Sequence, residues 1–223
     1  MIKVDMHVHT SCSLDSLIPF KDLLETCDYH GIDCVAVTDH NTIECALKLY
    51  EMAPLRIIVG EEIHTTSGEI IGLFLKEHVP PGLSPAETVS RIKEQDGLVY
   101  VPHPFDKLRA SVIKRQSFDE ILPKVDIIET YNSRNAFPWS NHKASSFALE
   151  KSIIMGVGSD AHTSFEVGKA YALIEPFSSA EDFLSKLANA EYHTRKTPVM
   201  FNLVNKVYKT MRSMKRKLSI QTR

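Results

Sequence analysis

The sequence predicts an α/β protein whose strands close into one (β/α) barrel. Short β-branched runs alternate with helical patterns along most of the chain. Several of these runs are apolar at every position, as expected for strands that are covered on both faces. Repeated strand–helix alternation gives largely parallel strands joined by right-handed crossovers. Seven or eight strands in one unbroken stretch favour a closed barrel over an open doubly wound sheet.

The expected strands and helices follow in chain order. Strands are predicted at residues 2–8, 34–37, 56–59, 70–75, 98–101, 125–131, 153–157 and 170–174. A helix is predicted to begin after Ser84, because a proline and the capping-box residue Glu87 follow it. Ser179 begins another helix, with acidic residues in the first turn. Gly31 and Gly97 follow helical patterns where a left-handed C-terminal cap is expected.

The composition is that of a globular chain that can bury a full core. Of the 223 residues, 43% are hydrophobic and 24% are charged, which excludes disorder, collagen-like sequence and a small disulfide scaffold. No apolar run approaches the roughly 20 residues that span a bilayer. Residues 1–5 lack the apolar stretch of a signal peptide, so we expect a cytoplasmic protein without a transmembrane segment. The four cysteines show no CxxC spacing, and we interpret them as reduced thiols.

The formal charge of −2 averages two different regions. The last 23 residues hold seven of the 26 basic residues and none of the 28 acidic ones, so residues 1–200 carry −9 and the tail carries +7. From Met200 onward, apolar side chains recur every three to four residues with basic side chains mostly on the other face, which predicts an amphipathic helix. We therefore expect a barrel domain at 1–195 and a basic helix at 196–223. This helix either caps the flank of the barrel or contacts nucleic acid or another anionic surface.

Histidines and carboxylates gather where predicted strands end. The first strand ends in Asp5-Met6-His7-Val8-His9, and its alternation directs residues 5, 7 and 9 to one side. Later strand ends carry Thr38-Asp39-His40, Gly60-Glu61-Glu62, His103, Glu129 and Ser159-Asp160-Ala161-His162. In a (β/α) barrel these ends lie on one face, where such enzymes build their sites. Five of the ten histidines are therefore expected at one barrel mouth.

This group of side chains predicts bound divalent cations. One histidine at a strand end is more often structural, but five of them with several carboxylates favour a site for more than one ion. Carboxylates at one barrel mouth repel each other, and divalent ions relieve the repulsion. Imidazole and carboxylate together suit zinc, manganese or iron. The chain has no GxGxxG or GxxxxGK[ST] phosphate loop and no GxSxG nucleophile elbow, which argues against a nucleotide-binding loop and a serine triad.

In the same order, these motifs resemble those of the PHP (polymerase and histidinol phosphatase) superfamily. The resemblance rests on Asp5-x-His7-x-His9-Thr10, Thr38-Asp39-His40-Asn41-Thr42, Gly60-Glu61-Glu62, His103-Pro104 and Gly158-Ser159-Asp160-Ala161-His162. It covers residues 1–195, and residues 128–134 resemble the PHP-associated C-terminal region of small stand-alone members. The resemblance implies a distorted seven-stranded (β/α) barrel with a trinuclear metal site and phosphoesterase activity.

The resemblance also implies which residues hold the metals. The first position is formed by His7, His9, Glu62 and Asp160; Glu62 bridges to a second position completed by His103; and Asp15, His40 and His162 form the third. The family often has a further histidine on the strand after Gly-x-Glu, where this chain has Glu69, and His64 is an alternative ligand. We therefore expect two to three divalent ions of manganese, zinc or iron.

Other polar residues are expected around these ligands. Asp5 and Asp39 are expected to accept hydrogen bonds from the outer ring nitrogens of the histidine ligands, and Glu61 is expected to point away from them. Arg109 and Arg134 follow strands at the barrel mouth and are candidates for contacts with substrate phosphate. A surface ion pair is an equally good interpretation of each arginine.

The predicted function is the hydrolysis of a phosphate ester in a nucleotide, an oligonucleotide or a small phosphomonoester. Two or three divalent ions lower the pKa of a shared water, which supplies a metal-held hydroxide for in-line attack. The alternative is a metal-binding barrel without catalysis that serves as an interaction or regulatory module. Because every core ligand type is present, the sequence favours the enzyme.

Overall fold

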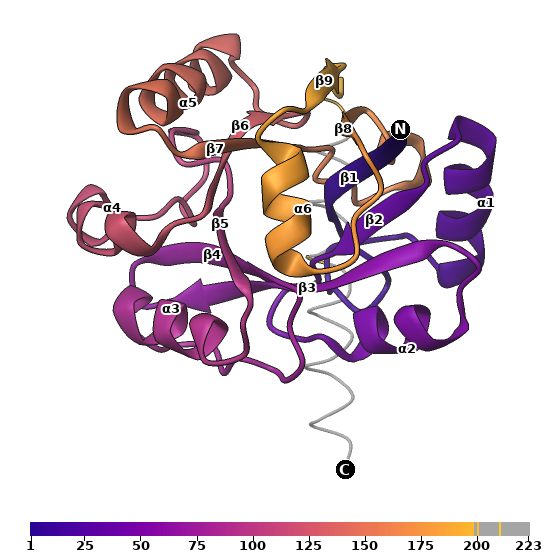
Figure 1. Ribbon diagram of the computed structural model, residues 1–223, viewed down its shortest axis with the longest axis horizontal. Helices are drawn as coiled ribbons and strands as arrows, with labels where there is room; N and C mark the ends of the chain where they lie inside the picture. The colour runs from indigo at the N-terminus through magenta and orange to yellow at the C-terminus, as the bar shows by residue number, and fades with distance from the viewer. Residues whose placement is uncertain (199, 201–209, 211–223) are drawn as a thin grey trace.

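Nine strands form one sheet in the computed structural model, which describes residues 1–198, 200 and 210 (Figure 1). The strands are β1 (Ile2–Val8), β2 (Cys34–Val37), β3 (Arg56–Thr65), β4 (Gly68–Leu73), β5 (Leu98–Val101), β6 (Ile127–Asn132), β7 (Ile154–Gly158), β8 (Ala170–Ile174) and β9 (Glu191–Thr194). Their order in the sheet is β7-β6-β5-β4-β3-β2-β1-β8-β9. The predicted C-terminal helix lies outside the described residues, apart from a few positions at its start and Thr210.

The sheet is nearly closed into a barrel. Strands β1, β2 and β3 are parallel neighbours, as are β5, β6 and β7. At the carboxyl ends of β1 and β7 the chain closes the ring, because the Asp160 amide donates to the His7 carbonyl at 2.8 Å and the His9 amide donates to the Ala161 carbonyl at 2.9 Å. These contacts confirm the predicted barrel-like α/β fold.

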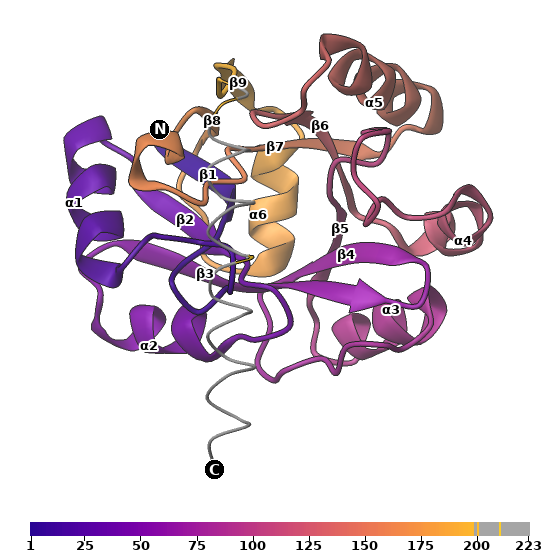
Figure 2. The same cartoon turned by 180° about the vertical axis from the view of Figure 1, so that it is seen from behind.

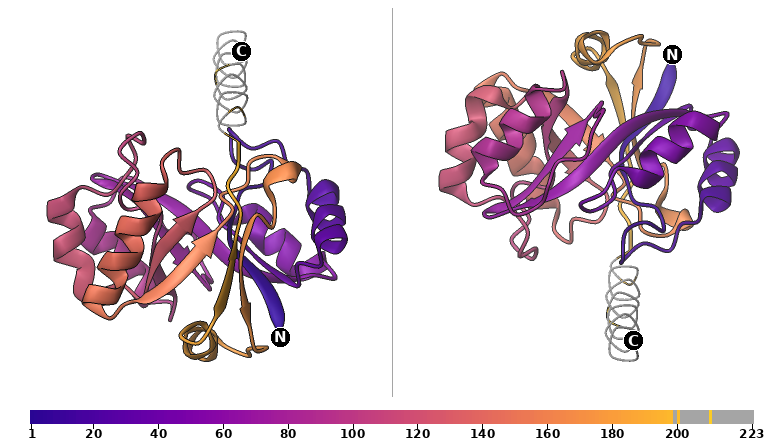
Figure 3. Two further views of the ribbon diagram at one scale, coloured as in Figure 1. Left: turned by 90° about the horizontal axis from the view of Figure 1, so that it is seen from above. Right: turned by 90° about the horizontal axis from the view of Figure 1, so that it is seen from below.

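Six α-helices pack on this sheet in the described part of the chain (Figure 2). They are α1 (Phe20–His30), α2 (Glu44–Met52), α3 (Pro85–Lys93), α4 (Arg115–Ile121), α5 (Pro138–Lys151) and α6 (Ala180–Leu187). One buried cluster joins the first five helices to the outside of the sheet, and a second joins Phe183 and Leu187 of α6 to strand residues such as Tyr100. Helix α6 lies at the end of the barrel where β1 begins (Figure 3). The opposite end, where β1 and β7 finish, is left for the polar side chains.

Strand β4 departs from the predicted parallel alternation. It pairs antiparallel with both β3 and β5, so β3 and β4 form a hairpin in place of a strand–helix–strand unit. Gly68 follows the turn with a φ of 118°, and a Cβ there would lie 2.3 Å from the Cα of Ile113. The predicted strands at 56–59 and 70–75 are therefore parts of one longer antiparallel pair. The predicted strand ended at residue 59, but β3 continues to Thr65, so only Thr66 and Ser67 separate it from β4.

The predicted helix ends are confirmed with one exception. Ser84 forms the expected capping box with Glu87, and Ser179 accepts a hydrogen bond from the Asp182 amide at the start of α6. Gly31 ends α1 in the left-handed conformation. The prediction that Gly97 takes the left-handed conformation after α3 was wrong. Asp96, one position earlier, has the left-handed φ of 61°.

The interpretation of all four cysteines as reduced thiols was also wrong. Cys12 and Cys45 form a disulfide, while Cys27 and Cys34 are free and buried. The pair is 33 residues apart in sequence, but the loop after β1 folds back against α2 and brings the two Cα atoms within 6.1 Å. The disulfide therefore ties the loop between His9 and Asp15 to α2.

Removing this disulfide is expected to lower the free energy of unfolding. Closing a loop of 33 residues restricts the unfolded chain by about 3–4 kcal/mol, so Cys45→Ser should lose about that much stability in urea unfolding. Cys12→Ser and the double variant should lose the same amount, because each breaks the same bond. Wild-type protein whose unfolding is unchanged by a thiol reductant would contradict the prediction.

Candidate metal centre

The polar ends of the strands converge on one buried cluster at the barrel mouth. Residues from seven segments contribute, and together they are the nine metal ligands predicted from the sequence: His7, His9, Asp15, His40, Glu62, Glu69, His103, Asp160 and His162. All are buried except His40, which is partly exposed. The structure therefore brings every predicted ligand into one connected group.

The first predicted position lies where β1, β3 and the end of β7 meet. The Nε2 atoms of His7 and His9 are 3.0 Å apart. Glu62 Oε2 lies 3.4 Å from the first of these nitrogens and 3.2 Å from the second, and Asp160 Oδ1 lies 3.6 Å and 3.5 Å from them. The donor atoms of His7, His9 and Glu62 thus lie within 4.8 Å of one another, and Asp160 faces both imidazoles.

The second predicted position lies beside the hairpin. His103 Nε2 is 3.1 Å from Glu62 Oε1 and 3.8 Å from Glu69 Oε2. The other oxygen of Glu69 is 3.0 Å from Nε2 of His64, whose side chain is 47% exposed. Because β3 and β4 are antiparallel partners, His64 and Glu69 stand directly opposite each other. The hairpin therefore presents both of the alternatives that the sequence left open.

The third predicted position lies on the side of the loop after β1. The Asp15 carboxylate is 3.5 Å from His40 Nε2 and 3.6 Å from His162 Nε2. The imidazole of His9 joins them, since its nitrogen and those of His40 and His162 lie within 4.8 Å of one another. Glu62 connects this group to the others, because its Oε2 is 3.3 Å from His40 Nδ1. The three positions form one continuous cluster with Glu62 at its centre.

The donor atoms fit divalent cations. Ligands about 2.0–2.2 Å from a tetrahedral ion lie about 3.3–3.6 Å apart, and the contacts around Glu62 Oε2 range from 3.2 to 3.4 Å. Asp160 Oδ1 and His40 Nδ1 are buried without a hydrogen-bond partner among the described residues. Such atoms are costly in a protein interior unless a partner satisfies them. A bound cation would supply that partner for both.

The charges of the cluster respond to one another. Burial lowers the pKa of His9, but its contacts with Asp160 and Glu62 outweigh burial and raise the value to about 9. The pKa of His7 likewise lies well above its usual value, because nearby carboxylates outweigh burial. Burial raises the pKa of Asp160, yet Arg109 and the histidines hold it well below its usual value. Without a cation, His7 and His9 therefore hold protons while Asp160 stays ionised.

Addition of a divalent ion is expected to stabilise the fold. An ion that binds only the folded chain adds about 2.7 kcal/mol at a concentration one hundred times its Kd, because it relieves the buried carboxylates of the cluster. Unfolding in urea, with Mn²⁺ or Zn²⁺ and with a chelator, measures the difference. Asp160→Asn should respond less, since it removes a donor charge. Equal stability with and without chelator would contradict the prediction.

A second layer of hydrogen bonds holds the predicted ligands, and only some of its residues were predicted from the sequence. Glu129, at the end of β6, was noted as a strand-end carboxylate but given no role. Its Oε1 is 3.0 Å from His7 Nδ1 and accepts from the Tyr100 hydroxyl at 2.9 Å, while Oε2 accepts from the His103 amide at 2.7 Å and from Asn132. Burial and the charge of Glu129 raise the pKa of Tyr100, so its hydroxyl remains a donor. Glu129 thus positions two predicted ligands at once.

The two aspartates expected near ring nitrogens accept hydrogen bonds from backbone amides and hydroxyl groups instead. Asp39 accepts from the Thr10 amide at 2.7 Å and from the hydroxyls of Thr10 and Ser13, and Asp5 accepts from the Ser159 amide at 3.0 Å. The outer nitrogen of His9 lies 3.2 Å from the Ser13 hydroxyl. These carboxylates therefore fix the loops that carry the predicted ligands. They do not hold the rings directly.

The backbone is unusual where ligands enter the site. His103 and Asp160 have φ values of 32° and 54°. Residues other than glycine rarely adopt such positive φ values. Gly158 precedes this turn, and a Cβ there would lie 2.4 Å from the Cβ of His7. The close approach of β7 to β1 therefore requires glycine. Backbone strain of this kind is found where a fold fixes functional groups.

The two predicted arginines contact different groups of Asp160. Arg109 Nη2 contacts the Asp160 carboxylate and donates to Asn132 at 3.3 Å, and its side chain is 23% exposed. Arg134 is buried, with Nε 3.3 Å from the Glu166 carboxylate and Nη1 3.4 Å from the Asp160 carbonyl. Only the first of these guanidinium groups combines exposure with contact to the cluster.

A barrel with imidazole and carboxylate donors at the carboxyl ends of its strands defines a metal-binding barrel of the type that hydrolases use. Comparison with known families gives a consistent result: residues 5–141 match the PHP domain and residues 138–192 match the PHP-associated region. The chain belongs to the PHP family. The uncharacterized protein MJ0417 of Methanocaldococcus jannaschii is 42% identical over 173 residues, which cover 76% of this chain and 69% of that protein.

Solved structures share the fold at low sequence identity. PsfC from Pseudomonas syringae matches with a TM-score of 0.69 at 17% identity, over 94% of this chain and 98% of that chain. A two-domain protein from Bacteroides vulgatus, with a predicted PHP-like metal-dependent phosphoesterase, gives 0.62 at 16%, over 87% and 65%. Endonuclease Q bound to a duplex with an abasic lesion gives 0.65 at 14%, over 86% and 58%. These matches show that the chain shares its fold with these proteins. No helix within the described residues has the length and apolar character needed to cross a membrane.

Proposed function

We propose that this chain hydrolyses phosphate esters at the Glu62-centred cluster, with two to three divalent ions bound by the nine predicted ligands. The observation that carries the proposal is the position of Glu62. Its two carboxylate oxygens face four imidazoles from three different segments at 3.1–3.4 Å. A carboxylate with both oxygens directed at separate donor groups is suited to join neighbouring metal positions.

The cations would supply the hydrolytic chemistry. When bound, divalent ions lower the pKa of water, orient the phosphoryl oxygens and neutralise the charge that develops on them. His7, His9 and Asp160 would hold one position, His103 and Glu69 the second, and Asp15, His40 and His162 the third. Glu62 would be shared. The hydrogen bonds that Glu129 and Asp39 accept would keep the donor atoms in place.

Two groups at the open edge of the cluster would act on the substrate itself. Arg109 would donate hydrogen bonds to a phosphoryl oxygen, because its guanidinium is partly exposed and already reaches the cluster through Asp160. His64 is the most exposed imidazole next to the cluster, and Glu69 faces its Nε2 at 3.0 Å. We assign to His64 the delivery of a proton to the departing oxygen. The contacts of Arg134 favour support of the turn at residues 160–162.

A substrate panel tests the proposal. Phosphomonoesters, nucleotides, single-stranded oligonucleotides and phosphodiesters would be incubated with the protein in Mn²⁺, Zn²⁺ or Fe²⁺, with the metal content measured on the same preparation. Release of phosphate or of a cleaved product that requires the metal is the expected result. If the protein binds metal stoichiometrically but cleaves none of these substrates, the non-catalytic barrel becomes the correct interpretation.

A further inference from the structure

The guanidinium of Arg109 is held in place by three side-chain oxygens at the barrel mouth. Its Nε donates to Asp106 Oδ2 at 3.3 Å, and its Nη2 donates to Asn132 Oδ1 at 3.3 Å and contacts the Asp160 carboxylate. An arginine side chain has five N–H donors, of which one is on Nε and two are on each terminal nitrogen. The three acceptors therefore engage Nε and both donors of Nη2. The two N–H groups of Nη1 have no acceptor in the part of the chain that the structure describes.

This guanidinium lies one carboxylate away from the first predicted metal position. Asp160 Oδ2 contacts Arg109, while Asp160 Oδ1 lies 3.6 Å and 3.5 Å from the Nε2 atoms of His7 and His9. The Arg109 side chain is 23% exposed. A phosphoryl group bound at the cluster would therefore meet a charged donor whose orientation is already set.

Asp106 belongs to a compact turn that begins at a predicted metal ligand. The Asp106 amide donates to the His103 carbonyl at 3.1 Å, and the Arg109 amide donates to the Asp106 carbonyl at 3.2 Å. The Asp106 carboxylate accepts from the Leu108 amide at 3.1 Å, a local contact by which an aspartate fixes a turn. One oxygen of this buried carboxylate thus holds the turn, and the other holds the arginine. The turn therefore fixes the position of Arg109 relative to His103.

Asn132 holds the guanidinium from the end of β6. Its Nδ2 donates to Glu129 at 2.9 Å and to Asp160 at 3.1 Å, while its Oδ1 accepts from the Arg134 amide at 2.9 Å and from Arg109. If the amide turned over, its oxygen would face two carboxylates and its NH₂ would face two donors. The oxygen of Asn132 therefore stays directed at Arg109.

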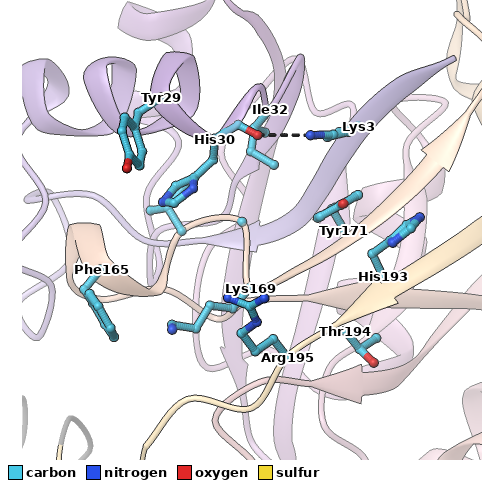
Figure 4. Close-up of a pocket in the computed structure, with 12 residues that line it drawn as sticks. Lys3, Tyr29, His30, Ile32, Phe165, Lys169, Tyr171, His193, Thr194 and Arg195 are labelled. Atoms are coloured by element: carbon cyan, nitrogen blue, oxygen red, sulfur yellow. Dashed lines mark hydrogen bonds between the residues drawn. The ribbon is translucent and has the colours of Figure 1, made fainter.

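The basic side chains of a cavity on the flank of the barrel do not reach the metal cluster. Lys3, Lys169 and Arg195 line this cavity of about 550 Å³, which lies between α1 and the strands β8 and β9 (Figure 4). The Lys169 ammonium lies 4.1 Å from the centroid of the Phe165 ring. Within the described residues, none of these three cations contacts a predicted metal ligand. They therefore offer no alternative to Arg109 at the metal site.

We propose that Asp106 and Asn132 are positioning residues for Arg109, which fix its Nε and Nη2 so that Nη1 donates to a phosphoryl oxygen of the substrate. The inference rests on the function proposed for the Glu62-centred cluster. A guanidinium that is already oriented loses less conformational freedom when phosphate binds, which increases the affinity for phosphate.

Binding of inorganic phosphate to the metal-loaded full chain, measured by calorimetry, tests the inference without requiring turnover. Asp106→Asn keeps the shape of the side chain and removes its charge, and within the described residues this side chain contacts no side chain of a predicted metal ligand. The variant should bind phosphate about tenfold more weakly, as expected when one hydrogen bond to a charged group is weakened, with the metal content of the wild type. In an Arg109→Gln background the same change should alter the affinity by less than about twofold, because two residues that act as a unit are not additive.

Two further variants complete the experiment. Asn132→Ala, measured at saturating metal, should also weaken phosphate binding, and again only when Arg109 is present. Asp119→Asn is the matched control, because Asp119 Oδ2 faces Arg115 Nε at 2.8 Å in the same kind of pair on α4. It should bind phosphate as the wild type does. Circular dichroism of each variant shows whether the fold is retained.

Four results would overturn the inference. The first is a metal-loaded wild type that does not bind phosphate, and the second is wild-type affinity in both Asp106→Asn and Asn132→Ala. The third is an equal loss of affinity with and without Arg109, which would mean that neither residue acts through the arginine. The fourth is loss of metal from Asp106→Asn with normal phosphate affinity at saturating metal, which would make Asp106 a support of His103. Phosphate binding that depends on all three residues, in a protein that hydrolyses no ester, would support the inference while contradicting the proposed function.

Discussion

Glu62→Gln is expected to abolish metal-dependent turnover, with a loss of at least about a thousandfold, while the barrel remains folded. Oε2 of Glu62 lies 3.2–3.4 Å from three imidazoles and Oε1 lies 3.1 Å from the fourth. A glutamine side chain has nearly the same volume, but it carries an amide NH₂ in place of one oxygen and has no charge. At least one metal position therefore loses its shared ligand. Loss of one metal ligand removes both the activation of water and the neutralisation of charge. Metal content and turnover would be measured on the same sample.

The neighbouring residue provides a matched control. Glu61 points to the other side of β3, where its carboxylate accepts from the Val79 amide at 3.0 Å and lies 2.8 Å from His78 Nδ1. Glu61→Gln makes the same chemical change one position away and should affect stability, with metal content and turnover near those of the wild type. If Glu62→Gln keeps its metal and its activity, Glu62 is not the shared ligand and the proposed arrangement is wrong.

The contrast between these two glutamates shows which features of the site can be predicted from the sequence. Alternation along a strand was sufficient to separate Glu61 from Glu62, because successive side chains point to opposite faces. The same rule, together with the position of parallel strand ends in a barrel, predicted that His7, His103 and Asp160 would meet. The fold class and the convergence of the ligands therefore depend on periodicities that the sequence displays directly.

The features that the sequence did not reveal depend on contacts between distant segments. The Cys12–Cys45 disulfide requires the loop after β1 to lie against α2, and no local pattern encodes that approach. The roles of Asp5 and Asp39 depended on the path of loops whose amides they bind. Glu129 was visible as a strand-end carboxylate, but its partners come from β1, β5 and β6, so its role could be recognised only in three dimensions.

Glu129→Gln is expected to weaken metal binding and turnover about 10- to 100-fold, the usual effect of losing a partner that orients a metal ligand. The Glu129 carboxylate accepts hydrogen bonds from the Tyr100 hydroxyl, the His103 amide and Asn132. It also faces His7 Nδ1 at 3.0 Å. Glutamine has only one oxygen that can accept from these donors, and its amide NH₂ would face at least one of them donor to donor. His7 and His103 would lose their fixed orientation, although neither ligand is itself changed.

Tyr100→Phe separates orientation from packing. It removes one hydrogen bond to Glu129, at 2.9 Å, but leaves the carboxylate in contact with both ligand segments. Its effect on metal affinity should therefore be well below that of Glu129→Gln, although both residues are buried and both variants lose stability. Metal titration by calorimetry and unfolding in urea distinguish the two effects. If the two variants lose stability equally and neither loses metal affinity, Glu129 supports only the core, and the orientation of His7 and His103 comes from the strands alone.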